Sequence, residues 1–303
     1  MRIIKETNIN FMGMTKAAII GSVILISLGI ISLIIKGGPK YGIDFTGGVS
    51  LGLKFEQPIR VGEVRSILSG IGFGNSEIKA FATGNEILIR LQQQEDMDLI
   101  SNKIIEELRN KLANNPFEIR SKDTVGPRIG SELRNDAIKA IIISLILILI
   151  YISWRFEFRF AVGAVVALFH DVLITLGLFS IFNFEVSLSV VAAFLTLVGY
   201  SLNDTIVVFD RIRENLKVMR KESSLTIFNK SINQTLSRTI LTALTTLFVV
   251  TIIFFFGGEV IHGFSFALLV GIIVGTYSSI FIASPVAYAW YLRSEAKAGL
   301  AVR

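Results

Sequence analysis

The sequence contains no cysteine and only two histidines among its 303 residues. Without cysteine, the chain can form neither a disulfide framework nor a thiolate metal site. The two histidines, His170 and His262, stand too far apart in sequence to show the spacing of metal ligands on one element. Neither a Walker-type nor a dinucleotide-binding glycine motif is present. These absences predict a protein that has no metal, nucleotide or other cofactor.

Charge is also absent, or nearly so, from long stretches of the chain. Hydrophobic residues make up 52% of the sequence, above the roughly 45–50% of soluble globular proteins. A run of about 20 apolar residues is long enough to cross a bilayer core of ~30 Å. Six such runs predict a polytopic α-helical membrane protein, with spans at 17–35, 137–154, 160–184, 186–209, 239–258 and 263–292. The first span has no small-residue cleavage site before the next segment, so we expect an uncleaved anchor.

Residues 36–136, between the first two spans, have the pattern of a soluble domain. Alternating apolar residues predict strands at 49–55, 76–82, 86–92 and 117–121. Helical spacing predicts helices at 61–70 and 95–114, and Pro116 ends the second of them. The resulting order β-α-β-β-α-β is that of a ferredoxin-like α+β domain.

The distribution of charge predicts how the chain is oriented. Basic and acidic residues are equal in the soluble domain, fourteen of each, so the excess of the whole chain, +6, lies outside it. Basic residues collect in the predicted loop at 211–238 and in the tail at 293–303. By the positive-inside rule, these segments and the N-terminal residues 1–16 are cytoplasmic, and 36–136 is extracytoplasmic. A pattern of this kind indicates a lipid bilayer as the partner of the basic segments rather than nucleic acid.

Asp204 is the most informative single residue, because it follows eighteen uncharged residues in the predicted fourth span. An ionised carboxylate at membrane depth costs roughly 2.5–3.5 kcal/mol on insertion scales. Burial favours its neutral form and a nearby cation its charged form, so Asp204 could exchange a proton when its surroundings change. The alternatives are a structural hydrogen bond to another helix or a position close to water. We expect a function in proton relay, the commonest use of such carboxylates. The neighbour of Asp204, Asn203, is either a secondary relay or a structural residue.

Two further features of the spans leave alternatives open. Arg238, at the start of the fifth span, is either an ordinary cytoplasmic anchor or the counter-charge of Asp204. His170 and Asp171, inside the third span, form either a hydrogen-bonded lock or a secondary relay.

Small or polar residues recur three, four or seven positions apart in three spans, a spacing that places them on one helix face and lets membrane helices approach closely. The stripes are Gly263, Ala267, Gly271, Gly275, Ser279 and Ala283; Gly163, Ala167, His170 and Gly177; and Ala192, Thr196, Gly199 and Asn203. Bundle packing accounts for most of them, but the sequence does not tell whether the facing helix belongs to this chain or to a partner.

Four motifs make the chain resemble the SecF family of the bacterial Sec protein-export machinery, which is itself similar to proton-driven transporters of the resistance-nodulation-division class. They are YGIDFTGG at 41–48, which contains Gly42, Asp44, Gly47 and Gly48, VGP at 125–127, VGYSLNDTIVVFDRIREN at 198–215, and SINQTLSRT at 231–239. The resemblance implies a proton relay of Asp204 and Arg238, which favours the counter-charge role for the arginine.

The resemblance also implies what the protein works with. Members of the family are not enzymes; they pair with a SecD-like chain in the cytoplasmic (inner) membrane and associate with the SecYEG channel and often with YajC. Proton flow then drives motion of the extracytoplasmic domains, which promotes the export and release of preproteins.

Two other functions compete with this one. An autonomous proton-driven exporter of small molecules or lipids predicts a duplicated chain or a homo-oligomer, which six spans and one small domain fit poorly. A purely structural assembly factor predicts that neutral residues are tolerated at both Asp204 and Arg238.

Overall fold

The computed structural model describes residues 7–81, 84–92, 96–155, 158–258 and 261–297. The outermost parts of the two predicted termini, and residues 259–260 of the turn predicted before the last span, lie outside this range. The chain divides into two compact units, a small unit of Tyr41–Ala140 and a membrane unit of Met1–Lys40 with Ile141–Arg303.

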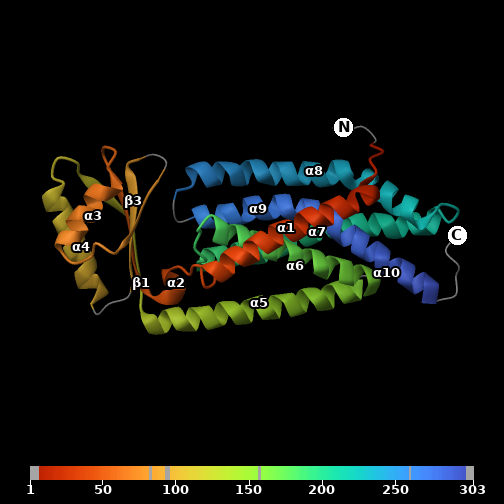
Figure 1. Cartoon of the computed structure of the whole chain (residues 1–303), viewed down its shortest axis with the longest axis horizontal. Helices are drawn as coiled ribbons and strands as arrows, with labels where there is room; N and C mark the ends of the chain where they lie inside the picture. The colour runs from red at the N-terminus through yellow and green to blue at the C-terminus, as the bar shows by residue number, and fades with distance from the viewer. Residues whose placement is uncertain (1–6, 82–83, 93–95, 156–157, 259–260, 298–303) are drawn as a thin grey trace. The chain divides into compact units, whose positions relative to one another are not determined.

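The small unit contains one four-stranded antiparallel sheet with two long helices, which confirms the predicted β-α-β-β-α-β order (Figure 1). Its elements are β1 (Gly48–Phe55), α3 (Val61–Gly70), β2 (Glu77–Ala80), β3 (Glu86–Gln92), α4 (Met97–Lys111) and β4 (Phe117–Val125). The strand order is β2-β3-β1-β4, which is the ferredoxin-like order that the sequence predicts.

Apolar side chains from the sheet and both helices form the core of the small unit. β1 is central: Leu51 pairs with Ile89 of β3 on one side and with Lys122 of β4 on the other. Leu68 of α3 and Leu108 of α4 are completely buried with the strand residues. The helical spacing of these apolar residues therefore turns one face of each helix toward the sheet.

A glycine pair leads the chain into β1. The short helix α2 (Ile43–Thr46) ends at Gly47, and both Gly47 (φ +74°) and Gly48 (φ +140°) have left-handed backbone conformations. A Cβ atom on Gly48 would lie 2.3 Å from the carbonyl oxygen of Leu91 in β3. Only glycine satisfies both the conformation and this close approach.

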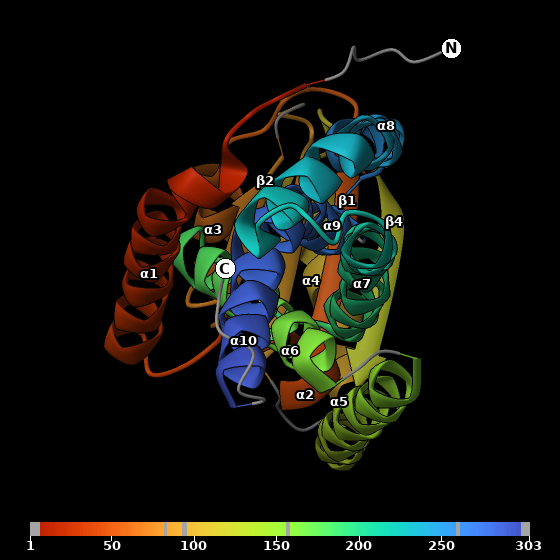
Figure 2. The ribbon, with the colours of Figure 1, turned by 90° about the vertical axis from the view of Figure 1, so that its right-hand side faces the viewer.

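Among the residues that the structure describes, six helices are long and apolar enough to cross a bilayer, in agreement with the predicted number of spans. The second of them begins in the small unit and continues into the membrane unit. The six are α1 (Phe11–Ile35), α5 (Pro127–Arg155), α6 (Phe158–Ile181), α7 (Leu188–Val218), α8 (Ser224–Phe256) and a last span made of α9 (His262–Ser278), the π-helical turn η1 (Ser279–Ala283) and α10 (Ser284–Lys297). Of these, α6, α7 and α9 are the most buried, whereas α1, α5 and α8 lie at the periphery (Figure 2).

Helix α5 begins ten residues before the predicted span, at Pro127 rather than at residue 137. Pro127 fits the first position of a helix because its missing N–H needs no partner there. The ion pair of Arg128 with Glu132, one turn later at 3.1 Å, also favours helix. Hydropathy locates the membrane, and a polar helix can continue beyond it.

The prediction that residues 211–238 form a loop is wrong, because here too polar helix continues beyond the apolar segments. Helix α7 continues to Val218 and α8 begins at Ser224, so the connection is only residues 219–223. The hydroxyl of Ser223 accepts a hydrogen bond from the backbone N–H of Thr226 and thereby caps α8. The polar ends of both helices are amphipathic, and Ile212 and Phe228 are buried between them. The basic side chains therefore project from a helical hairpin.

The small-residue stripe of the last span packs mainly against α7 of the same chain. A Cβ atom on Gly271 would collide with Leu197, and one on Gly275 would lie 3.0 Å from the Cβ of Ser201. Further along the span, the residues of η1 form a wider π-helical turn just before Pro285. Proline has no backbone N–H to donate. Ala283, the last residue of that turn, and Ala287 of α10 lie next to Gly163 of α6.

Helix α1 crosses α6 at a second pair of glycines. A Cβ atom built on Gly29 would lie 2.6 Å from the Cα of Gly177. In a lipid environment the hydrophobic effect does not drive helices together, so close backbone packing of this kind is what favours their association.

Candidate functional site

Asp204 lies on α7, where its side chain is almost completely buried, with 3% exposed. Its Oδ2 atom accepts no hydrogen bond from any residue that the structure describes. The groups that act on the carboxylate, Arg238 and Thr242, both belong to α8. The structure therefore brings together the two residues that the sequence predicts as a relay pair, although Arg238 is itself exposed on the surface of the chain.

Hydrogen bonds hold α7 and α8 together on both sides of this pair. One turn before Asp204, the hydroxyl of Tyr200 donates to the carbonyl oxygen of Thr242 at 2.9 Å. Toward the hairpin, the side-chain amide of Asn215 donates to the hydroxyl of Ser231 at 2.8 Å. Hydrogen bonds thus join the two helices on both sides of Asp204 along α7, whereas one oxygen of the Asp204 carboxylate has no hydrogen bond among the described residues.

This arrangement allows Asp204 to change its protonation state. A buried carboxylate with an unbonded oxygen is poorly stabilised when it is ionised, because desolvation is not compensated by donors. The guanidinium group of Arg238 opposes this by favouring the ionised form. Small movements between α7 and α8 would change the balance between the two effects.

Asn203 and its stripe do not pack inside the chain. Ala192, Thr196, Gly199 and Asn203 are all exposed on the surface of α7, and no atom outside the helix lies within 4 Å of a Cβ built on Gly199 in the described part of the chain. The prediction that this face meets a helix is therefore not met within the chain.

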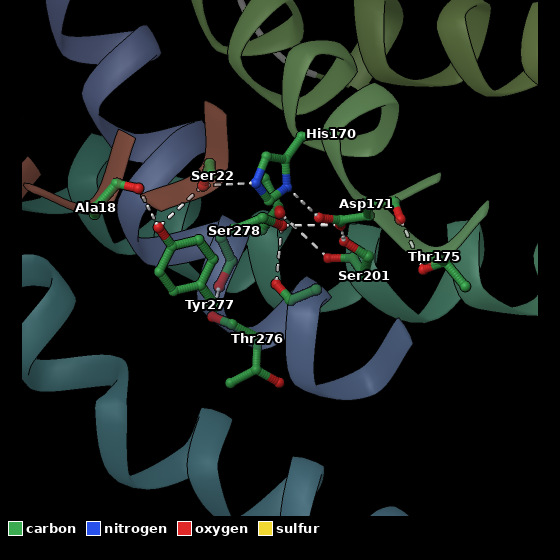
Figure 3. A network of polar contacts seen from close by, with 12 residues as sticks. Ala18, Ser22, His170, Asp171, Thr175, Ser201, Thr276, Tyr277 and Ser278 are labelled. Atoms are coloured by element: carbon green, nitrogen blue, oxygen red, sulfur yellow. Dashed lines mark hydrogen bonds and ion pairs between the residues drawn. The ribbon is translucent and has the colours of Figure 1, made fainter. Parts of the chain in front are cut away.

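His170 and Asp171 form the centre of a second, buried polar network (Figure 3). Nδ1 of His170 lies 2.9 Å from Oδ1 of Asp171. Oδ2 of Asp171 accepts hydrogen bonds from Ser201 of α7 at 2.5 Å and from Ser278 of α9 at 2.8 Å. His170 and Asp171 are 6% and 1% exposed, so the carboxylate is fully bonded and fully buried, in contrast to Asp204.

The network continues from His170 to α1. Nε2 of His170 lies 2.9 Å from the hydroxyl of Ser22, which in turn lies 3.0 Å from the hydroxyl of Tyr277. Tyr277 donates to the carbonyl oxygen of Ala18 at 2.6 Å. Four helices, α1, α6, α7 and α9, therefore meet in one set of hydrogen bonds.

Sequence reasoning did not find the partners of the two carboxylates. For Asp204 the missed partner is Thr242. For Asp171 the missed partners are Ser201 and Ser278, and Ser22 and Tyr277 extend the network from His170. The one available signal was the run of threonines in the uncharged fifth span, which recur three or four positions apart beyond Arg238. A lone serine in an apolar span carries no such pattern.

The residues of the family motif belong to the small unit. Gly42, Asp44, Gly47 and Gly48 lie in and around α2 and at the start of β1, where the glycines serve backbone geometry. In the described part of the chain, no group of three or more histidine and acidic side chains could hold a metal ion.

Six described helices that are long and apolar enough to cross a bilayer, a buried carboxylate within electrostatic reach of an arginine on the next helix, and one α+β domain define a multi-pass membrane protein with a buried ionisable site. Residues 104–293 match the family described as protein export membrane protein SecD/SecF, C-terminal, and residues 31–59 match the SecD/SecF GG motif. The chain therefore belongs to the SecD/SecF family of protein-export membrane proteins.

Similar proteins place it on the SecF side of that family. The chain is 50% identical over 288 residues to the protein translocase subunit SecF of Desulfurispirillum indicum, covering 93% of this chain and 91% of the relative. It is 47% identical over 292 residues to that of Vibrio alginolyticus, covering 96% and 92%. These relatives are named as translocase subunits, which favours that hypothesis over the autonomous exporter.

A solved structure shows the same fold. The crystal structure of SecDF, a translocon-associated membrane protein from Thermus thermophilus, superposes with a TM-score of 0.83 at 39% identity and covers 95% of this chain. The match takes up 39% of the SecDF chain, so this chain corresponds to about two-fifths of that protein.

Proposed function

We propose that the protein is a proton-driven accessory subunit of the Sec protein translocase, which acts with a SecD-like chain to promote export and release of preproteins across the cytoplasmic membrane. The observation that carries the proposal is the buried Asp204, with an unbonded oxygen, facing Arg238. An intramembrane ionisable residue with an opposite charge nearby is the usual element of a proton pathway. Membership of the SecD/SecF family directs that pathway to protein export.

The mechanism begins with the protonation of Asp204. A neutral Asp204 is no longer attracted to Arg238, so the contact between α7 and α8 weakens and the two helices shift. The shift is transmitted to the extracytoplasmic domain, which contacts the emerging preprotein. One charge that moves through 100 mV releases about 2.3 kcal/mol, so a few protons can offset the free energy of a domain rearrangement.

The orientation that this mechanism needs follows from the positive-inside rule. The basic helical hairpin around residues 219–223 and the C-terminal segment face the cytoplasm, as does the N-terminus, and the small unit is extracytoplasmic. Basic side chains at the cytoplasmic ends of the spans then contact lipid headgroups.

A SecD-like chain supplies the missing wall of the site. The small and polar face of α7, with Thr196, Gly199 and Asn203, is exposed beside Asp204. Small and polar side chains on a membrane helix mark a helix–helix contact, and the matching SecDF structure is a longer chain. The channel SecYEG, the protein YajC and the preprotein are the further partners of the assembled complex.

The test is Asp204→Asn in proteoliposomes that contain the chain, its SecD-like partner and the SecYEG channel. We expect the variant to assemble and to lose the stimulation of export by a proton gradient. Glu214→Gln is the matched control, because Glu214 is an exposed carboxylate of the same helix that pairs with Arg211. Full gradient-dependent stimulation by Asp204→Asn would contradict the proposal.

A second variant separates a proton-driven subunit from a structural assembly factor. The double substitution Asp204→Asn with Arg238→Gln leaves a neutral pair that keeps the two helices compatible. An assembly factor would retain export with this pair, whereas a proton-driven subunit would retain assembly and lose the response to the gradient.

A further inference from the structure

The network around His170 and Asp171 takes no part in the mechanism above, although it buries two titratable groups at membrane depth. We propose that His170 and Asp171 hold one shared proton and act as positioning residues: the neutral pair locks α7 to α1, α6 and α9, and thereby holds Asp204 against α8. The proposal follows from counting the protons in the hydrogen bonds of Figure 3.

The count starts at Tyr277, where the direction of the bond is fixed. A carbonyl oxygen only accepts, so the proton of the Tyr277 hydroxyl lies toward Ala18. The contact of 3.0 Å between Tyr277 and Ser22 must then use the proton of Ser22. With its single proton used in this way, Ser22 accepts at its contact of 2.9 Å with His170. Nε2 of His170 therefore carries a proton.

The same count fixes the charge of the pair. The contact of 2.9 Å between Nδ1 of His170 and Oδ1 of Asp171 also requires a proton. If that proton is on the histidine, the pair is an imidazolium and a carboxylate; if it is on the aspartate, both groups are neutral. The pair has no net charge in either arrangement, whereas a neutral histidine beside an ionised aspartate would leave one contact in the network without a proton.

A neutral pair is also the state that burial favours. An isolated charge at membrane depth is expensive, and both oxygens of Asp171 have partners, with Ser201 and Ser278 both donating to Oδ2. The network ends inside the protein, at the backbone of Ala18. These features distinguish Asp171, which is fully bonded, from Asp204, which has an unbonded oxygen.

The lock reaches the proposed proton site through Ser201. Ser201 is bonded to Asp171 on one side of α7, and Asp204 follows three residues later, one turn along the helix. A helix fixed at Ser201 has a fixed rotation about its axis, so Asp204 continues to face Arg238 and Thr242 of α8. This last step rests on the proposed function, whereas the shared proton does not.

The shared proton is tested directly by nitrogen NMR of the full chain labelled with [15N]histidine. The chain contains only one other histidine, His262, and a His262→Gln variant identifies its signals. We expect Nε2 of His170 to carry a proton, and Nδ1 either to carry one or to accept one from Asp171. An unprotonated Nε2 would overturn the proposal, since the count of hydrogen bonds would then be wrong. The signal of an Nδ1 with no proton in its contact, as beside an ionised aspartate, would also overturn the proposal.

The lock is tested by two substitutions of Asp171 in the complex with the SecD-like chain. In Asp171→Asn, the amide can donate to His170 and its oxygen can accept from both serines, so every bond remains while no proton can be transferred. We expect a melting temperature within about 3 °C of that of the parent chain and a loss of gradient-dependent stimulation of less than about twofold. Asp171→Leu should lower the melting temperature and also reduce the stimulation of export by the gradient, because it leaves buried donors without acceptors.

A loss of stimulation in Asp171→Asn equal to that of Asp204→Asn, at an unchanged melting temperature, would show that Asp171 transfers a proton and would overturn the lock. Where Asp171→Leu does not fold, Ser22→Ala and Tyr277→Phe break the α1 end of the network and should destabilise the complex. Retention of stimulation by Asp204→Asn would instead contradict the proposed function, and the NMR measurement and the melting temperatures would still decide on the lock.

Discussion

At the scale of single residues, the two buried aspartates of the membrane unit have opposite environments. Asp171 has a hydrogen-bond partner for each oxygen, and Asp204 has an oxygen with none in the described part of the chain. Full bonding fixes a group in one state, and incomplete bonding leaves it able to change. This difference is the basis on which we propose a structural role for Asp171 and a switching role for Asp204.

Arg238 gives the first prediction at this scale. Arg238→Gln removes the charge that favours ionised Asp204, so gradient-dependent stimulation of export should fall by about tenfold or more. Arg238→Lys keeps the charge and should retain part of the stimulation, since lysine provides a point charge without the planar fork of arginine. Export assays in proteoliposomes measure both. Equal losses for the two variants would contradict a role of the charge.

Gly48 gives a second prediction, for the small unit. Gly48→Ala forces a side chain into a left-handed conformation and into the carbonyl of Leu91, so this unit should be destabilised in the full chain by about 1–3 kcal/mol. Gly62→Ala is the control, because no atom in the described part of the chain lies within 4 Å of a Cβ at that position. Urea unfolding followed by proteolysis measures the difference, and equal stabilities would contradict the argument.

The sequence was sufficient to predict Asp204 and Arg238, because a charge in an apolar span stands out against its surroundings. It was not sufficient to predict Ser22 or Tyr277, whose contact joins residues 255 positions apart. Serine and tyrosine are ordinary in membrane helices, so their role depends entirely on which helices become neighbours. The sequence leaves open whether His170 and Asp171 form a lock or a relay, because that too depends on which helices become neighbours.

At the scale of helices, close packing depends on glycine at crossing points. Gly29→Ala places a methyl group 2.6 Å from the backbone of Gly177 and should destabilise the chain by about 1–3 kcal/mol. Gly21→Ala, on the same helix with no described neighbour within 4 Å, should be neutral or stabilising by up to about 1 kcal/mol. Thermal unfolding in detergent separates the two. A similar melting temperature for both variants would show that α1 does not cross α6 at this point.

The helical hairpin between α7 and α8 predicts a pattern of proteolysis. In inverted membrane vesicles, trypsin should cut the chain after Arg220 or Lys221, in the short connection. Between the start of α7 and the end of α8, the backbone leaves the helical conformation only at residues 219–223. Arg213 and Lys230 lie within helices and should be protected. Mass spectrometry of the fragments identifies the sites, and early cleavage after Arg213 would favour the long loop that hydropathy predicts.

Helix boundaries were harder to predict than helix number. Apolar length indicates a membrane span because the bilayer requires it, and all six spans were found in this way. The polar ends of α5, α7 and α8 carry no such signal, since an amphipathic helix in water contains as many charges as a loop. In the small unit, alternation and turn residues define both ends of β3, whose bounds agree with the prediction. The prediction of 117–121 was too short for β4, which continues to Val125.

At the scale of the whole molecule, the exposed face of α7 predicts a partner in the membrane. Gly199→Leu fills a surface that has no neighbour in the described part of this chain, so the chain should fold normally while copurification of the SecD-like chain decreases severalfold. Gly21→Leu, at a position of α1 that is equally open among the described residues, should not affect it. Quantitative copurification measures this, and unchanged recovery with Gly199→Leu would place the partner elsewhere.

The π-helical turn at Ser279–Ala283 has a consequence for the tolerance of the last span to changes in length. The small residues before the turn pack against α7, and those at its end and after it pack against α6. Deleting one residue from the turn would restore a regular α-helix, but it would also rotate everything after it by about 100°. The irregular turn therefore lets one continuous helix keep two different neighbours, and alignments that place a gap within it would separate chains whose last span packs differently after the turn.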